Sequence, residues 1–343
     1  MMRAGGGVEV DPGIPLLERA LDPEQVASHL RGRIGGTADP GVRVVVRTIR
    51  TLRHKPGRRC LIEYEIEVAR PPTMAPAVVT LLGKVRRRGA DVATFNLLRT
   101  LRARGFDRDC PDGVAVPEPV ALVPELGLWL QHRVGGTPAA ARLDGPDGAL
   151  VGRRLVDAAH KVHQAAVPAR RRHSMHDELR ILRQCLETLA ARRADWAPRL
   201  ERLLRACDRI GAATPAQPSC GIHRDFYPDQ VLLDGRRLYL LDFDLYCEGD
   251  PALDIGNCIA HITERSLRVR GDPGALADIE AAMEDRFVEL AGEAARPAVR
   301  GYALLTLARH IYISAQIEER RPFTATLLEL CEQRLGADGR TLP

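Results

Sequence analysis

The sequence predicts an α+β protein of two lobes, in which an N-terminal lobe of antiparallel strands carries one helix and a C-terminal lobe is mostly helical. Three observations lead to this prediction. Strand-like runs dominate the first part of the chain, long stretches with helical spacing follow residue 148, and a Gly- and Pro-rich linker segment lies between them. We place the first lobe at 1–133, the linker at 134–139 and the second lobe at 140–343.

The N-terminal lobe begins with a short helical segment at 15–30, in which Asp22-Pro23-Glu24 is a helix-start signal. Predicted elements then follow in the order strand 42–52, strand 58–69, strand 77–87, helix 90–105 and a hairpin made of "PVALV" and "LGLWLQHRV". The second strand alternates apolar residues with Glu63, Glu65 and Glu67, which is typical of an antiparallel strand with one buried face. These three glutamates are therefore expected to form a solvent-facing stripe.

The C-terminal lobe is predicted to be helical except for one block of short strands at 219–245. Before that block, helical spacing covers 149–167, 174–192 and 196–209. After it, a helix begins near Asp250 and Pro251, a pair that suits a helix start. Further helices are expected near 273–291, 296–318 and 322–335.

Composition narrows the classes of protein that this chain can be. The net charge of +5 is modest, and with aromatic residues at 4% the chain lacks the stacking platforms that nucleic-acid binding needs. No apolar run is long enough to cross a membrane, and the N-terminus lacks the design of a signal peptide. The eight cysteines include no C-x-x-C pair, which argues against a zinc site. We therefore expect a cytoplasmic protein that binds neither nucleic acid nor membrane.

The segment "HRDFYPDQVLLDG" carries the strongest chemical signal. Phosphoryl transfer needs a carboxylate that orients the attacking hydroxyl, oxygen ligands for Mg²⁺ and a cation on the nucleotide phosphates. Asp225 is the candidate carboxylate, and two short apolar strands around the turn Asp234-Gly235 return the chain to Asp242. Asp242 precedes Phe243, as the metal-binding aspartate does in a D-F-G segment. Each piece alone is common, since an aspartate in a turn usually only forms the turn, but the ordered set is specific.

The same segment resembles the aminoglycoside phosphotransferase-like kinases. Their usual pattern is H-G-D-x-x-P-x-N, a hairpin, I-D-F/W and then G-D-P-x-x-D-L-A, and this chain reads "HRDFYPDQ", "LLDFD" and "GDPALDIG". The resemblance is strong over 219–263 and loose over roughly 40–320, where "VDAAHKVHQA" is similar to the family's A-x-L-H helix and "ELGLWLQHRVGGTP" to its hinge.

This resemblance implies a two-lobed protein-kinase-like fold with the nucleotide bound by the N-terminal lobe. It further implies that Asp225 is the catalytic base, that Asp242 is the principal Mg²⁺ ligand and that Asp250 and Asp254 anchor the helix that follows. His223 is expected either to organise the loop or to be a buried core histidine, and the sequence leaves both readings open.

Three positively charged residues are candidates for nucleotide binding. The chain has only three lysines among 50 basic residues, and Lys84 lies in the third strand, where a kinase holds its phosphate-binding lysine. An ammonium is a compact point charge that fits where a guanidinium does not. Lys55 and Arg58, in the turn between the first two strands, are expected to assist Lys84, although a flexible surface turn explains them equally well.

Two departures from the family pattern bear on activity. Gln230 stands where the family carries a metal-binding asparagine, so its amide oxygen is predicted as a metal ligand on a longer stem. That change allows Mn²⁺ as well as Mg²⁺ and favours the maltokinase-like branch of the superfamily. In addition, the helix at 90–105 has no glutamate to pair with Lys84, and its only acid, Asp91, lies at its start.

We therefore predict a small-molecule kinase that uses ATP or GTP with Mg²⁺ and phosphorylates a hydroxyl of a sugar, an amino sugar such as an aminoglycoside, or a related metabolite. A nucleotide-binding pseudokinase is the main alternative; a protein or lipid kinase and a plain helical scaffold are weaker ones. Seven acids at 272–293 would suit a cationic acceptor, but a solvated helix face explains them better. Tyr302, His310 and Tyr312 are candidates to line an acceptor site and are more typical of a core.

Overall fold

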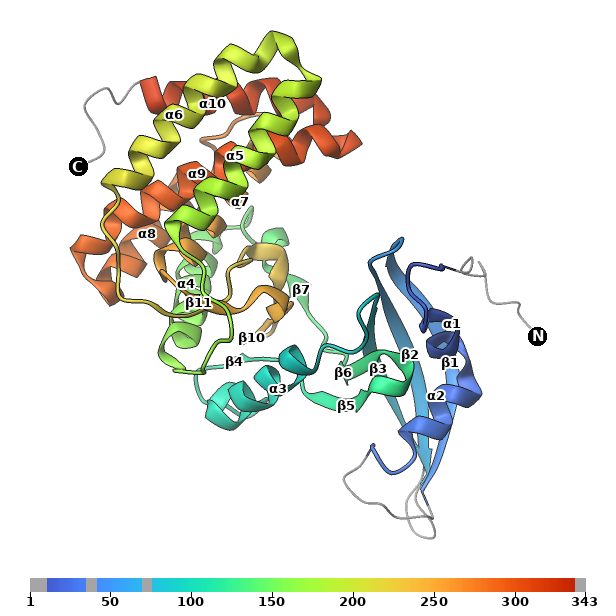
Figure 1. Cartoon of the computed structure of the whole chain (residues 1–343). Coiled ribbons are helices and arrows are strands. Elements are labelled where there is room, and N and C mark those ends of the chain that lie inside the picture. The colour runs from blue at the N-terminus through green and yellow to red at the C-terminus, as the bar shows by residue number, and fades with distance from the viewer. Residues whose placement is uncertain (1–10, 35–41, 70–75, 337–343) are drawn as a thin grey trace. The chain divides into compact units, whose positions relative to one another are not determined.

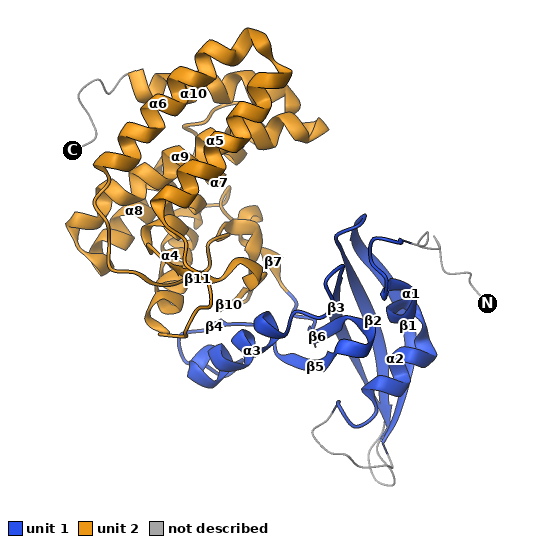
Figure 2. Cartoon of the chain, viewed as in Figure 1, with its two compact units in different colours: residues 1–135 blue, residues 136–343 orange. Residues whose placement is uncertain are grey.

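A computed structural model describes residues 11–34, 42–69 and 76–336 of the chain. The chain divides into two compact units, residues 1–135 and 136–343 (Figure 2). The division lies between Gly135 and Gly136, inside the segment 134–139 that composition marks as a linker. The functional roles assigned to the two lobes stay predictions.

The first unit is built on an antiparallel sheet with the strand order β1-β2-β3-β6-β5 (Figure 1). The strands are β1 (Arg43–Lys55), β2 (Arg59–Ala69), β3 (Ala77–Arg86), β5 (Pro119–Val123) and β6 (Leu128–His132). β1, β2 and β3 follow one another in sequence and pair with their neighbours. β6 then adds to the free edge of β3, which is why a strand more than forty residues further along the chain lies beside it.

One face of this sheet packs on two short helices, α1 (Leu17–Leu21) and α2 (Pro23–Leu30). Buried residues of β2, among them Ile62 and Tyr64, share one apolar core with Leu17 and Leu30, and the Tyr64 hydroxyl donates a hydrogen bond to the Ala20 carbonyl at 2.8 Å. The prediction of one helical segment at 15–30 is therefore corrected to two helices. Asp22 separates them because its backbone is extended and its carboxylate caps the first amides of α2.

The opposite face of the sheet carries polar residues and the helix α3 (Val92–Leu101). Phe95 of α3 meets the ring of Trp129 edge-on, with centroids 6.4 Å apart. Glu63 lies on this face, but only 6% of it is exposed, and Arg50 and Arg133 both form ion pairs with its carboxylate. The prediction that Glu63 faces solvent is therefore wrong. Alternation shows that the two faces of a strand differ in polarity, but it does not show which side chains cover each face. The predicted helix 90–105 is shorter as well, since α3 ends at Leu101 and a π-helical turn follows.

The second unit is mostly helical, as predicted. Its helices are α4 (Gly148–Gln164), α5 (Met175–Arg192), α6 (Ala197–Ala213), α7 (Ala252–Arg270), α8 (Ala277–Ala291), α9 (Arg296–Gln316) and α10 (Thr324–Gly336). α7 and α9 pack closely enough that a Cβ on Gly256 would come within 2.7 Å of the α9 backbone at Val299 and Ala303. Leucines of α5, α6, α9 and α10 form the apolar core of the bundle, for example Leu186, Leu203, Leu305 and Leu327.

Short strands at one end of this unit hold the candidate site. They are β7 (Thr137–Pro138), β8 (Cys220–Ile222), β9 (Val231–Asp234), β10 (Arg237–Leu240) and β11 (Cys247–Gly249). β9 pairs with β10 as the predicted hairpin and with β7 on its other side, while β8 pairs with β11. Gly235 takes a φ of +57° in the hairpin turn, which glycine adopts without strain. Among the described residues, no helix is both long and apolar enough to cross a membrane.

Candidate active site

The loop between β8 and β9 is held by a buried carboxylate from the first turn of α7. Asp254 is fully buried and accepts three hydrogen bonds, from the backbone amides of His223 at 2.9 Å and Arg224 at 2.7 Å and from His163 Nε2 at 2.9 Å. Three donors on one buried carboxylate fix the direction in which the chain leaves β8. The sequence indicated that Asp254 anchors its own helix; the structure shows that it also anchors the loop that carries Asp225.

Arg224 takes a backbone conformation that normally favours glycine. Its φ is +69°, and the left-handed region costs an L-residue about 1–2 kcal/mol. The family pattern that this loop resembles has glycine here. The hydrogen bond from the Arg224 amide to Asp254 holds the residue in this conformation. The loop therefore keeps the same backbone conformation although arginine replaces the glycine of the family pattern.

His223 connects the loop to the end of the hairpin. Its Nε2 donates a hydrogen bond to the Leu241 carbonyl at 2.7 Å, and its ring packs against Phe243 with centroids 4.6 Å apart. Only 1% of the residue is exposed. His223 is thus a buried histidine, and its hydrogen bond joins the candidate catalytic loop to the residue immediately before Asp242. The two alternatives left open by the sequence, a core histidine and a residue that organises the loop, are therefore compatible.

Asp242 and Gln230 lie at the same end of the β9–β10 hairpin. The Leu241 amide donates to the Gln230 carbonyl at 2.9 Å, which extends the strand register by one pair beyond Val231 and Leu240. Asp242 follows directly with φ +55°, so the chain turns out of the strand at the carboxylate. The hairpin therefore brings together two residues that are 12 positions apart in the sequence.

The two aspartates influence each other electrostatically. Burial raises the pKa of Asp225 above the ordinary aspartate value, and the negative charge of Asp242 raises it further. His223, Arg309 and Arg224 act in the opposite direction, since a positive charge nearby stabilises the carboxylate. Asp225, Asp242, Gln230 and His223 are thus gathered in one place within the second unit.

The donor atoms at this place suit a hard divalent cation. Gln230 Nε2 donates to the Tyr227 hydroxyl at 3.1 Å, which leaves the amide oxygen Oε1 as the atom that could bind metal. Two carboxylates and an amide oxygen are the ligand types of Mg²⁺ and Mn²⁺, and Mg²⁺ commonly takes only one or two protein carboxylates, with water and phosphate oxygens for the rest. No cluster of three or more His, Cys, Asp or Glu residues that could hold a metal occurs in the part of the chain that the structure describes. Asp225, Asp242 and Gln230 are of the ligand types that would hold Mg²⁺ or Mn²⁺ together with phosphate and water oxygens.

A buried polar network that was not predicted from the sequence lies behind the loop. Asn257 of α7 donates to the Phe226 carbonyl at 2.9 Å, and Arg309 of α9 donates to the Asn257 side-chain oxygen at 3.0 Å. Arg309 also donates to Glu178 of α5 at 2.9 Å, and Glu178 contacts His173 at 2.6 Å. Asn257, Arg309 and Glu178 come from three different helices, so only the folded structure brings them to the residue next to Asp225.

An aromatic column extends from the same loop. The Tyr227 ring stacks on His261 with centroids 4.2 Å apart, and the His261 ring meets His310 edge-on at 4.4 Å. His310 and Tyr302 are buried, as the core interpretation predicted, while Tyr312 is half-buried. Burial holds the pKa of His310 at about 3 and that of His261 well below its usual value. Both histidines are therefore neutral at physiological pH.

The residues predicted to bind nucleotide lie in the first unit. Lys84 is half-buried in β3, opposite Leu61 of β2 and Trp129 of β6 in the strand register. Lys55 and Arg58 flank the β1–β2 turn, which is anchored because the Asp11 carboxylate accepts a hydrogen bond from the Gly57 amide at 2.8 Å. The role of these residues stays a prediction.

Asp91, the only acid of the predicted helix 90–105, serves the start of α3. It accepts a hydrogen bond from the Thr94 amide at 3.0 Å and forms an ion pair with Arg86 at 3.1 Å. Glu63 likewise pairs with Arg50 and Arg133. The carboxylates of Asp91 and Glu63 both pair with arginines.

Solved structures of several kinases share the fold of this chain. A choline kinase from Cryptosporidium parvum Iowa II matches with a TM-score of 0.56 and 11% identity over 92% of this chain and 96% of that one. A thermostable mutant of the aminoglycoside phosphotransferase APH(4)-Ia, in a ternary complex with AMP-PNP and hygromycin B, matches with a TM-score of 0.55 and 15% identity over 92% of this chain and 99% of that one. A choline/ethanolamine kinase family protein from Mesorhizobium loti matches with a TM-score of 0.52 and 15% identity over 95% and 94%. At this identity the likeness shows the fold, which is the predicted two-lobed kinase-like fold.

The family follows from the sequence itself. The model of the phosphotransferase enzyme family APH matches residues 87–302, more than half of the chain. The chain therefore belongs to this family of phosphotransferases, as the motif at 219–263 predicted. Among curated proteins, no sequence matches it.

Proposed function

We propose that this protein transfers the γ-phosphate of ATP or GTP to a hydroxyl group of a small molecule such as a sugar or a related metabolite. The observation that carries the proposal is the pairing of Asp225 with Asp242, which is built from the Asp254 anchor, the His223 bridge and the β9–β10 hairpin. Burial raises the pKa of Asp225 and the charge of Asp242 raises it further, and a buried carboxylate perturbed by a charged neighbour is typical of functional sites.

In this mechanism, Asp225 accepts a hydrogen bond from the acceptor hydroxyl and orients its oxygen toward the γ-phosphorus. The bond from that oxygen to phosphorus forms, the bond from phosphorus to the β,γ-bridging oxygen breaks, and the hydroxyl proton passes to Asp225. Asp242 and the Gln230 amide oxygen hold the divalent cation, which neutralises charge on the phosphates when bound. Lys84, with Lys55 and Arg58 near the phosphates, binds the nucleotide.

The direct test measures nucleotide consumption over pooled hydroxyl compounds. ATP and GTP are each supplied with Mg²⁺ or Mn²⁺, and pools of sugars, polyols, amino sugars and amino alcohols are added in turn. Consumption that depends on one pool supports the proposal. Nucleotide binding without consumption in any pool favours the second candidate function, a nucleotide-binding pseudokinase. The observation that favours this candidate is Gln230, which stands where the family pattern has a metal-binding asparagine.

Tyr227→Phe is expected to weaken metal binding about 2–10-fold while leaving the fold intact. The substitution removes the hydroxyl that receives the Gln230 amide, and a hydrogen bond of this kind contributes about 0.5–1.5 kcal/mol. The ring and its stacking on His261 are retained. Mn²⁺ titration followed by electron paramagnetic resonance, in the presence of ADP, measures the change, and Tyr312→Phe on α9 is the matched control. Unchanged Mn²⁺ affinity in Tyr227→Phe would show that the hydroxyl does not position Gln230.

The acid limb of the pH–rate profile is expected to lie above the ordinary aspartate range, because burial raises the pKa of Asp225. Below this pKa, Asp225 is protonated and cannot accept the hydroxyl proton, so the rate falls as pH falls. Arg224→Gly removes a nearby positive charge and keeps the backbone amide that binds Asp254. Its acid limb should therefore move to higher pH than that of the parent at the same metal concentration; a limb that moves to lower pH contradicts this assignment.

A further inference from the structure

Two side chains of α7 hold the backbone on both sides of Asp225. Asp254 accepts hydrogen bonds at 2.9 and 2.7 Å from the two backbone amides that precede Asp225. Asn257, three residues further along the same helix, donates from Nδ2 to the Phe226 carbonyl at 2.9 Å, directly after Asp225. The peptide groups that flank Asp225 are therefore both fixed to one helix, and the direction in which its carboxylate points follows from both contacts.

Arg309 of α9 determines which way the Asn257 side chain faces. An asparagine amide can lie in two orientations, because its nitrogen donates and its oxygen accepts, whereas a guanidinium only donates. Arg309 donates to Asn257 Oδ1 at 3.0 Å. The oxygen must therefore face Arg309, which leaves Nδ2 as the atom that faces the Phe226 carbonyl. Because Asn257 is fully buried, bulk water does not compete for either atom.

Arg309 is held in turn by a buried carboxylate of α5. It donates to one oxygen of Glu178 at 2.9 Å, and the other oxygen accepts from His173 Nε2 at 2.6 Å. Burial opposes ionisation of Glu178, but the charge of Arg309 and the hydrogen bond to His173 outweigh it and keep the pKa of Glu178 below its ordinary value. The backbone amide of His173 donates to the Glu248 carbonyl of β11 at 2.8 Å. The orientation of the Asn257 amide is thus set from α5 and α9.

Stability alone is a weak explanation for this network. Well-packed apolar residues of similar volume often stabilise a fold as well as a buried ion pair does. Apolar residues cannot orient a neighbouring peptide, however, because they neither donate nor accept hydrogen bonds. A buried polar network whose hydrogen bonds are formed fixes a single arrangement, and this one ends at the carbonyl next to Asp225. Its location therefore favours a role in placing the carboxylate.

We propose that Asn257 and Arg309 are positioning residues for phosphoryl transfer. Arg309 orients the Asn257 amide, and this amide fixes the peptide that follows Asp225. The inference rests on the proposed kinase function and adds two residues to its machinery, neither of which has to touch the nucleotide or the acceptor. A displacement of about 1 Å at a reacting group can lower the rate about 10²-fold, so contacts behind the loop matter for catalysis.

Asn257→Asp and Asn257→Ala test the role of the amide. Both remove the donor to the Phe226 carbonyl, but the aspartate keeps the size of the side chain and the oxygen that faces Arg309. Each is expected to lower kcat about 10–100-fold. The KM for nucleotide should stay within a few-fold of the parent, because the residues predicted to bind nucleotide lie in the first unit. Urea unfolding of each variant checks that it is folded under the assay conditions. A kcat equal to that of the parent in either variant overturns the proposal.

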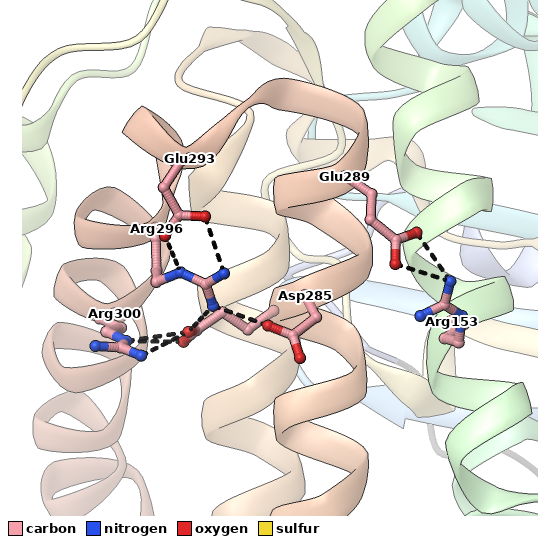
Figure 3. A network of polar contacts seen from close by, with 7 residues as sticks. Arg153, Asp285, Glu289, Glu293, Arg296 and Arg300 are labelled. Carbon is pink, nitrogen blue, oxygen red and sulfur yellow. Dashed lines mark hydrogen bonds and ion pairs between the residues drawn. The ribbon is translucent and has the colours of Figure 1, made fainter.

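Arg296→Ala is the matched control on the same helix (Figure 3). The ion-pair partners of Arg296 are Glu284 at 2.7 Å, Asp285 at 2.9 Å and Glu293 at 2.5 Å. None of these partners belongs to the loop that carries the candidate base. Its removal should lower stability and leave kcat within a few-fold of the parent. A fall in kcat as large as that of Asn257→Ala would show that loss of any such arginine lowers activity, and would overturn the positioning role.

A double-mutant cycle tests whether Arg309 acts through Asn257. In that case Arg309→Ala lowers kcat several-fold in the parent but changes it little in the Asn257→Ala background. Effects that multiply in the double variant overturn the proposed order of action. Absence of turnover in the parent with every hydroxyl compound overturns the proposed function, and this inference with it. Turnover in the parent with unchanged kcat in the variants overturns only the inference, so the two failures are distinguishable.

Discussion

Asp225→Asn is expected to lower kcat for phosphoryl transfer about 10²–10⁴-fold, the usual contribution of a general base. Asparagine has nearly the same shape, but its amide cannot take the proton of the acceptor hydroxyl. The substitution leaves the Asp254 anchor untouched, because the donors to Asp254 in this loop are the backbone amides of His223 and Arg224. The affinity for nucleotide should therefore change little, and steady-state kinetics together with calorimetric nucleotide titration measure both quantities.

Asp229→Asn is the matched control for this result. Asp229 lies four residues further along the same loop and is exposed, so the substitution removes one negative charge near the site without removing the base. It should keep kcat within a few-fold of the parent. If Asp225→Asn retained the parent kcat, or if both variants lost activity equally, Asp225 would not be the base.

Asp254→Ala is expected to destabilise the second unit by about 3–5 kcal/mol, the range found when one member of a buried, hydrogen-bonded charged group is removed. The substitution leaves the amides of His223 and Arg224 and the Nε2 of His163 without their shared acceptor in a fully buried place. Arg224 would also lose the bond that holds its left-handed backbone. Urea unfolding of the full chain, monitored by circular dichroism, measures the loss.

The comparison for this variant is Asp278→Ala, which removes an exposed carboxylate from the first turn of α8. A charge at a helix N-terminus contributes about 0.3–1 kcal/mol, so this variant should unfold close to the parent. A cost for Asp254→Ala no larger than that of Asp278→Ala would contradict the role of Asp254 as the anchor of the loop.

The fold was predictable because its information is local. Strand-like runs indicate β1 to β3, with clear alternation in β2; helical spacing indicates the later helices, and the turn at Asp234-Gly235 indicates the hairpin that places Asp242. The limits were local too. At Asp22-Pro23, the signal that starts α2 also ends α1, because an N-cap residue has an extended backbone. Helical spacing of apolar residues alone does not reveal such a break between two helices.

The parts of the site that were missed depend on contacts between distant segments. Arg309, Asn257 and Glu178 come from three helices and meet only when α5, α7 and α9 pack. Glu63 is buried because Arg50 and Arg133 cover it, which alternation along one strand cannot indicate. The acids at 272–293 were expected to be solvated, whereas several of them pair with arginines of neighbouring helices.

The most direct test of the central claim is transfer of labelled phosphate from [γ-³²P]ATP or GTP to a small molecule in the presence of Mg²⁺ or Mn²⁺. The account predicts a labelled product that forms with a small hydroxyl compound and that disappears with Asp225→Asn and without divalent metal. A protein that binds nucleotide and metal yet labels no compound in any pool, or that labels one equally well with Asp225→Asn, would contradict the claim that this site is a small-molecule kinase built on Asp225 and Asp242.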